Sequence, residues 1–206
     1  GARVEHVRTG KILHHSTLPQ ADVAPLVAEG MARGFTVMLW LYDAVYAQAD
    51  SPFLDAYREE TRDVPVKLAD LAALVDQPTE KVIWAGEPSA VASSLREFKT
   101  THGDRISLTI TTDWSLEFTG LKANKNDGVA ALAKHLRISA DAVLAFGDGN
   151  NDVPLLSWAG FGVAMPHGRA AAHAAANLVA PAGDPESAFA RAVELITANF
   201  AMSEVA

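Results

Sequence analysis

The fold is decided by one stretch of the chain, Val143-Leu144-Ala145-Phe146-Gly147-Asp148-Gly149-Asn150-Asn151-Asp152. It opens with four apolar residues and ends in a polar turn that holds two glycines, two carboxylates and two amides. A short apolar run that meets such a turn is typical of a strand buried on both faces of a parallel sheet. Ligands of open parallel sheets bind outside the carboxyl ends of the strands, so the turn predicts a functional site.

The segments around this stretch alternate between helical and strand patterns. Before it, Val129, Leu132, Ala133 and Leu136 are spaced as on one face of an amphipathic helix. After it we expect, in order, a helix over 152–158, a strand over 161–164, a helix over 169–175, a strand over 178–180 and a helix over 185–198. Strands and helices that alternate at this spacing predict βαβ units and a parallel sheet.

The first half of the chain has a different pattern. We expect a hairpin of residues 3–7 and 11–15, strands over 35–41, 45–47, 81–85, 106–110 and 116–118, and helices over 21–33, after Ser51-Pro52, and over 88–101. This order predicts a mixed α+β domain over residues 10–120, preceded by a junction at 1–9. The parallel α/β part would then cover residues 121–206.

Composition and charge restrict the function classes. The 206 residues contain 49% apolar and 20% charged residues and carry a formal net charge of −8, which argues against broad nucleic-acid binding. With no cysteine, disulfides, zinc–thiolate sites and cysteine nucleophiles are excluded. No apolar run reaches the ~18 residues of a membrane span, and the start at Gly1 has no signal-peptide pattern. We therefore expect a cytoplasmic protein that is not bound to a membrane.

The residue types of the polar turn are suited to phosphate chemistry. Asp148 and Asp152 offer the hard oxygen ligands that Mg²⁺ takes, and Asn151 can donate to a phosphate oxygen. Lys125, just before the predicted 129–136 helix, is placed to reach an anion held at the strand ends. The alternative is an ordinary loop, in which Asp152 caps the next helix and Lys125 is a solvated surface charge.

Together these residues resemble a known family. From Leu116 to Ala180 the chain is similar to the haloacid dehalogenase (HAD) superfamily, in its Cof-type branch of sugar- and metabolite-phosphatases. The family's third motif, a lysine before a helix, falls on Lys125, and its fourth motif, Gly-Asp-x-x-Asn-Asp, falls on residues 147–152. The resemblance implies an α/β fold with a parallel three-layer, Rossmann-like core and an α+β cap. It also implies that Mg²⁺ binds Asp148 and Asp152, and that phosphate binds Lys125 and Asn151.

The chain departs from the family pattern in three places. The family opens with an Asp-x-Asp nucleophile motif, and no Asp-x-Asp occurs in these 206 residues. The resemblance places that motif, and the central strand of the core, in a segment that would precede Gly1. Asn126 stands where the family has glycine, and Pro166-His167-Gly168 replaces its Gly-Asn-Ala. His167 either faces the site or is a solvated loop residue.

Three hypotheses follow. The first is a Mg²⁺-dependent phosphatase of small phosphorylated metabolites such as sugar phosphates, which acts through an aspartyl-phosphate and in which Lys125 is a catalytic residue. The second is a catalytically inactive, truncated remnant or interaction module. The third, a doubly wound nucleotide-binding domain, lacks the G-x-G-x-x-G turn that it needs.

The cap would set the choice of substrate. Its candidate residues are Trp40, Tyr42, Asp43 and Tyr46, which could equally be core aromatics and a turn aspartate. The sequence specifies neither the substrate nor the oligomeric state.

Overall fold

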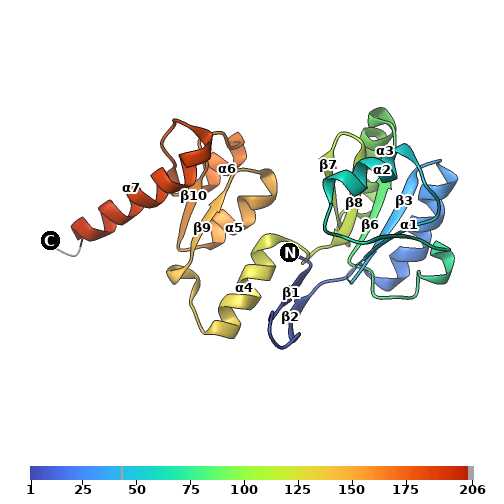
Figure 1. The fold of residues 1–206 in the computed structure, drawn as a ribbon, viewed down its shortest axis with the longest axis horizontal. Coiled ribbons are helices and arrows are strands. Elements are labelled where there is room, and N and C mark those ends of the chain that lie inside the picture. Colours follow the sequence, from blue (N-terminus) through green and yellow to red (C-terminus); the bar gives the residue numbers. More distant parts are fainter. Residues whose placement is uncertain (43, 204–206) are drawn as a thin grey trace. The chain divides into compact units, whose positions relative to one another are not determined.

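The structure, a computed structural model, describes residues 1–42 and 44–203, with side chains described to residue 197. The chain divides into two compact units. We call Ala2 with residues 15–123 the middle unit, and Gly1, residues 3–14 and the chain from Asn124 onward the terminal unit. Figure 1 draws the middle unit mainly in blue to green and most of the terminal unit in yellow to red.

The middle unit is built on a six-stranded mixed sheet in the order β5-β4-β3-β6-β8-β7 (Figure 1). Its strands are β3 (Thr36–Leu41), β4 (Ala44–Ala47), β5 (Val66–Leu68), β6 (Lys81–Ala85), β7 (Ile106–Thr112) and β8 (Ser115–Gly120). All neighbours pair antiparallel except β4 and β5, which are parallel. The short strand β5 is an element that the sequence pattern did not indicate.

Helices cover both faces of this sheet. The helices α1 (Gln20–Ala32) and α3 (Pro88–His102) pack on one face, and α2 (Pro52–Glu60) packs on the other. A 3-10 turn, η1, spans Leu71–Ala73. The side chain of Ser51 accepts a hydrogen bond from the backbone N–H of Leu54 at 3.0 Å, so the predicted start of α2 at Ser51-Pro52 is confirmed.

An aromatic cluster around Trp84 fills the middle of this core. The Trp84 ring lies 5.3 Å from Phe35, 4.9 Å from Phe98 and 4.7 Å from Phe118, measured between ring centroids. Its buried indole N–H donates to the backbone oxygen of Leu26 at 3.0 Å, so the polar atom of the ring is satisfied. These large, closely packed rings therefore account for much of the apolar surface that this unit buries.

The terminal unit contains a three-stranded parallel sheet in the order β11-β10-β9. Its elements in chain order are β1 (Arg3–Glu5), β2 (Ile12–His15, of which His15 belongs to the middle unit), α4 (Lys125–Leu136), η2 (Ala140–Ala142), β9 (Leu144–Gly147), η3 (Asn150–Asp152), α5 (Val153–Trp158), β10 (Phe161–Ala164), α6 (Ala170–Ala175), β11 (Leu178–Val179), η4 (Pro185–Ser187) and α7 (Ala188–Ser203). The strands β1 and β2 form a separate two-stranded sheet. The alternation of parallel strands and helices expected from the sequence is confirmed.

The parallel sheet lies between two helical layers, as expected for an α/β fold. On one face Ala145 and Ala164 pack against α5 and α6, with Val129 of α4 beside them. On the other face Val163 packs against Ala192 and Ile196 of α7. Because most of the buried side chains are small, this core is held by close backbone approach more than by large side chains.

Three details of this unit differ from the sequence prediction. Leu144 is 43% exposed, so the predicted burial of this strand on both faces is wrong at its first residue; within the described residues β9 is an outer strand of the sheet. In the predicted apolar stripe of the preceding helix, Leu132 and Leu136 are exposed. Ala133 of that stripe is buried and Val129 is half-buried. The helix also begins at Lys125 rather than near residue 129, because Asn124 caps it.

Candidate functional site

The polar turn follows β9, where the sequence placed it. Its backbone is tightly folded: a Cβ added at Gly147 would lie 2.4 Å from Cβ of Asp152, so only glycine fits at this position. The N–H of Asp152 donates back to the oxygen of Gly149 at 3.1 Å. The chain therefore reverses direction within a few residues, and the side chain of Asp152 lies against the backbone of the turn to which it belongs.

Asp152 is the buried anchor of the turn. One carboxylate oxygen accepts from the ammonium of Lys125 at 2.5 Å, and the other accepts from the N–H groups of Asp148 and Gly149, both at 3.0 Å. The side chain is only 3% exposed. Burial opposes its ionisation, but the hydrogen bonds from Lys125 and the two backbone N–H groups outweigh burial and hold the pKa of Asp152 below its ordinary value. Asp152 is thus an ionised carboxylate with three donors.

Lys125 reaches the turn from the first residue of α4. The side chain of Asn124 accepts from the N–H of Asp127 at 2.9 Å and fixes the start of the helix. The side chain of Lys125 remains 49% exposed although its ammonium is paired with Asp152. A lysine held in this way can present positive charge to an anion while its direction is set by a buried carboxylate.

Asp148 has a different environment from Asp152. Its side chain is 57% exposed, and its described ionic partner is His167, with 3.5 Å between Asp148 Oδ2 and His167 Nε2. His167 is also 57% exposed. The next polar residues of the turn, Asn150 and Asn151, are exposed as well. The structure thus places Asp148, Asn151 and Asp152 in one turn and joins Lys125 to it through Asp152.

The two carboxylates differ in what they can offer a metal ion. Both oxygens of Asp152 are engaged by protein donors, whereas the exposed oxygens of Asp148 are the hard donors that Mg²⁺ prefers. Across residues 1–42 and 44–203, no group of three His, Cys, Asp or Glu side chains could hold a metal ion. Mg²⁺ is usually held by one or two carboxylates and completed by water and phosphate, so this donor set fits part of a Mg²⁺ site.

Asn126 is a further polar residue beside the site. Its side-chain oxygen is buried and is one of the few buried polar side-chain atoms without a hydrogen-bond partner in the part of the chain that the structure describes. It follows Lys125 directly, at the position where the resemblance leads one to expect glycine. This departure from the family pattern therefore places a buried amide oxygen at the second residue of α4.

The candidate residues of the middle unit fall into two groups. Trp40 and Tyr46 are partly buried, and lysine ammonium groups lie over both rings, Lys81 at 5.3 Å and Lys67 at 5.5 Å. Tyr42 is 50% exposed. Asp43, the fourth candidate, lies outside the described residues.

Sequence reasoning missed one polar pair in this unit. His15 contacts the buried carboxylate of Glu80, with 2.9 Å between Nε2 and Oε1. The two residues are 65 positions apart and share no motif, so no local signal in the sequence points to their contact. The pair joins the start of the middle unit to its sheet.

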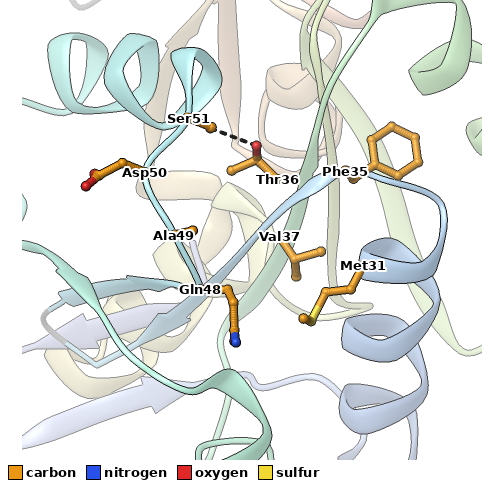
Figure 2. A pocket seen from close by; sticks show the side chains of 8 residues that line it. All are labelled: Met31, Phe35, Thr36, Val37, Gln48, Ala49, Asp50 and Ser51. Atoms are coloured by element: carbon orange, nitrogen blue, oxygen red, sulfur yellow. Dashed lines mark hydrogen bonds between the residues drawn. The ribbon is translucent and has the colours of Figure 1, made fainter.

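A small pocket of about 230 Å³ also lies in the middle unit, between the end of α1 and the start of α2. Figure 2 shows its lining, with the hydroxyl of Thr36 donating to Ser51 at 2.8 Å. Most of its polar groups already have partners: Ser51 caps α2, Asp50 pairs with Arg58 and Gln48 accepts from the N–H of Leu71. We therefore assign the candidate chemistry to the polar turn and not to this pocket.

No helix in the described part of the chain combines the length and the apolar character needed to cross a membrane.

Comparison with known proteins identifies the family that the chain resembles. A family model described as haloacid dehalogenase-like hydrolase matches residues 1–192. A solved structure of a haloacid dehalogenase-like hydrolase from Bacteroides thetaiotaomicron superposes with a TM-score of 0.82 at 19% identity, covering 95% of this chain and 74% of that one. At that identity the likeness concerns the fold alone.

Two curated relatives are similar in sequence. An HMP-PP phosphatase from Cronobacter sakazakii is 28% identical over 175 residues, 80% of this chain and 60% of the relative. A protein named Endoribonuclease YBEY, chloroplastic, from Arabidopsis thaliana is 26% identical over 184 residues, 87% of this chain and 31% of that protein. The chain thus spans less than two thirds of the length of either relative.

Proposed function

Because the chain belongs to the haloacid dehalogenase-like hydrolase family, we propose that it forms part of a Mg²⁺-dependent phosphatase of small phosphorylated metabolites, sugar phosphates among them. The observation that carries this proposal is the contact of Lys125 with Asp152, which ties a lysine to the turn that holds Asp148. Since the net charge of the chain is −8, a local cation such as Lys125 would offset the field that disfavours a bound phosphate. The name of the phosphatase relative supports a small phosphorylated compound as substrate class.

Each residue of the turn has a distinct role in this proposal. Asp148 is the direct metal ligand, since its oxygens are exposed. Lys125 neutralises phosphate charge and is the catalytic residue of the described set, while Asn151 donates to a phosphate oxygen. Asp152 belongs to the metal side of the site but acts through water and by orienting Lys125, because its own oxygens are engaged.

These roles fit what phosphoryl transfer requires. Hydrolysis of a phosphomonoester breaks the P–O bond to the alcohol and transfers the phosphoryl group to water, and catalysis rests mainly on positioning and charge neutralisation. A bound Mg²⁺ would polarise the phosphoryl oxygens and offset their charge. The covalent step needs an aspartate nucleophile, which in the family belongs to an Asp-x-Asp motif that these 206 residues do not contain.

We further propose that the middle unit is the cap and that the terminal unit belongs to the catalytic core. In the cap, Tyr42 is half exposed and the ammonium of Lys81 lies over the ring of Trp40, so both aromatic residues are candidates for contact with the part of the substrate beyond its phosphate. Asp43 adjoins them in the sequence.

The test is phosphate release by the purified full-length protein from a panel of phosphomonoesters with Mg²⁺. We expect Asp148→Asn and Lys125→Ala to lower kcat/KM by about a hundredfold or more, the range found when one charge-stabilising group is removed. Lys134→Ala, an exposed lysine on the same helix, and Asp141→Asn are the matched controls and should retain activity. Failure of the full-length protein to release phosphate from any ester would contradict the proposal.

A further inference from the structure

The turn that follows β10 is fastened to the turn that follows β9. The N–H of Met165 donates to the oxygen of Gly147 at 2.9 Å, and the N–H of Arg169 donates to the oxygen of Asp148 at 2.8 Å. Gly168 allows this approach, since a Cβ there would lie 3.2 Å from the backbone of Asp148. The backbone on both sides of His167 is therefore fixed by hydrogen bonds to residues 147 and 148.

The side chains of His167 and Asp148 lie as two ligands of one ion would. At 3.5 Å, Nε2 and Oδ2 are too far apart for a good hydrogen bond. Ligands of a divalent ion lie about 2.1 Å from it, so two adjacent ligands of one ion are separated by about 3.0–3.5 Å. Both side chains are more than half exposed, so a cation can reach the space between them.

Two other polar side chains near this pair, Asp152 and His173, already have hydrogen-bond partners. Asp152 has three donors, and the ring of His173 contacts the backbone oxygen of Met165 at 2.9 Å through Nε2. Asp148 and His167, in contrast, can accept a shared cation without loss of a described hydrogen bond. Water and substrate phosphate would supply the remaining ligands.

We propose that His167 is a direct ligand of the divalent cation held by Asp148, and that it shifts the preference of the site from Mg²⁺ toward transition metals such as Mn²⁺. This inference rests on the proposed role of Asp148 as a metal ligand. Imidazole nitrogen binds first-row transition metals well, whereas Mg²⁺ prefers oxygen ligands. The histidine stands where the resemblance leads one to expect asparagine, whose amide would leave an all-oxygen site.

The experiment uses Mn²⁺ as the probe and the full-length protein. Electron spin-echo envelope modulation of bound Mn²⁺ detects a directly coordinated imidazole nitrogen, independently of enzymatic activity. We expect this ¹⁴N modulation in the wild type, its loss in His167→Asn, and its retention in His135→Asn, a control at an exposed histidine of α4. By calorimetry, His167→Asn should weaken Mn²⁺ binding about tenfold or more and Mg²⁺ binding much less.

The outcomes separate this inference from the proposed function. If Mn²⁺ binds wild type and His167→Asn equally and without ¹⁴N modulation, while Asp148→Asn still abolishes binding, the histidine ligand is refuted and Asp148 keeps its role. If neither Mn²⁺ nor Mg²⁺ binds the wild type, both the inference and the metal site of the proposed function are refuted. A protein that binds Mn²⁺ through His167 but hydrolyses no phosphate ester would uphold the inference and contradict the phosphatase.

Discussion

The two units of the chain are held together in different ways. The middle unit packs large rings around Trp84, on a sheet covered by helices on both faces. The buried residues of the terminal unit are mostly small, with alanine prominent among them, and glycines allow segments of its backbone to approach closely. A Cβ added at Gly162, for example, would lie 2.4 Å from the backbone oxygen of Leu156. We infer that the middle unit depends on side-chain volume, whereas the terminal unit depends on close approach and on the hydrogen bonds of Asp152.

The largest expected effect is that of Trp84→Ala. Removing a fully buried tryptophan should lower the free energy of unfolding of the middle unit by about 3–5 kcal/mol. Hydrogen exchange measured by mass spectrometry, peptide by peptide, should show the loss of protection in β3, β6 and β8, with β9 and β10 unchanged. Leu156→Ala is the matched change in the terminal unit. It should lower hydrogen-exchange protection in β9 and β10 and leave β3, β6 and β8 unchanged. Equal loss of protection in both units would contradict the comparison.

An intermediate effect is expected for Asp152→Asn. The change weakens hydrogen bonds to Lys125 and to two backbone N–H groups, so the terminal unit should lose about 1–3 kcal/mol at neutral pH. In the wild type the lowered pKa of Asp152 contributes stability that is complete above the unfolded-state pKa of about 4 and is lost as pH falls through the folded-state pKa. Urea unfolding between pH 7 and pH 3 should therefore show a smaller acid-dependent loss in the variant than in the wild type.

The middle unit provides the contrast at alkaline pH. Burial, and then the charges of Glu117 and Glu60, raise the pKa of Tyr57 above its ordinary value. Since the unfolded chain ionises its tyrosines near pH 10, stability of this unit should fall as pH rises from that value toward the folded-state pKa. Tyr57→Phe should reduce this alkaline loss and leave the acid-dependent behaviour of the terminal unit unchanged.

The smallest effects concern the two helix caps. Asn124→Ala and Ser51→Ala each remove one side-chain acceptor at a helix start, and each should cost about 1 kcal/mol. Only Asn124 precedes a proposed catalytic residue, so Asn124→Ala should also lower kcat/KM severalfold, whereas Ser51→Ala should leave it unchanged. Thermal unfolding and phosphate release measured on the same samples test both statements. An equal effect of the two caps on activity would contradict the role of Lys125.

Much of the fold could be predicted from local patterns in the sequence. Residues 81–85 form a strand with the expected bounds, Ser51 caps α2, and the parallel order of β9, β10 and β11 follows from the spacing of their apolar runs. Such features depend on neighbours within one turn or one strand, which a sequence displays directly.

The remainder depends on contacts between distant residues. Lys125 and Asp152 are 27 positions apart, and the motif gave no indication that Asp152 has its oxygens occupied by this lysine and by its own turn. The pattern of α4 likewise predicted a buried stripe, although Leu136 is exposed. Which face of a helix is covered depends on what packs there, and hydrophobic spacing alone does not specify the partner.

The way in which Asp152 folds back onto residues 148 and 149 has a consequence for binding thermodynamics. A flexible acidic loop would lose conformational entropy when it closed around a phosphate and its cation, and that loss would weaken the affinity. Here the backbone of the turn is already ordered by contacts within the protein. A ligand therefore meets groups that are in place before it arrives, and most of its interaction energy remains available for binding and catalysis.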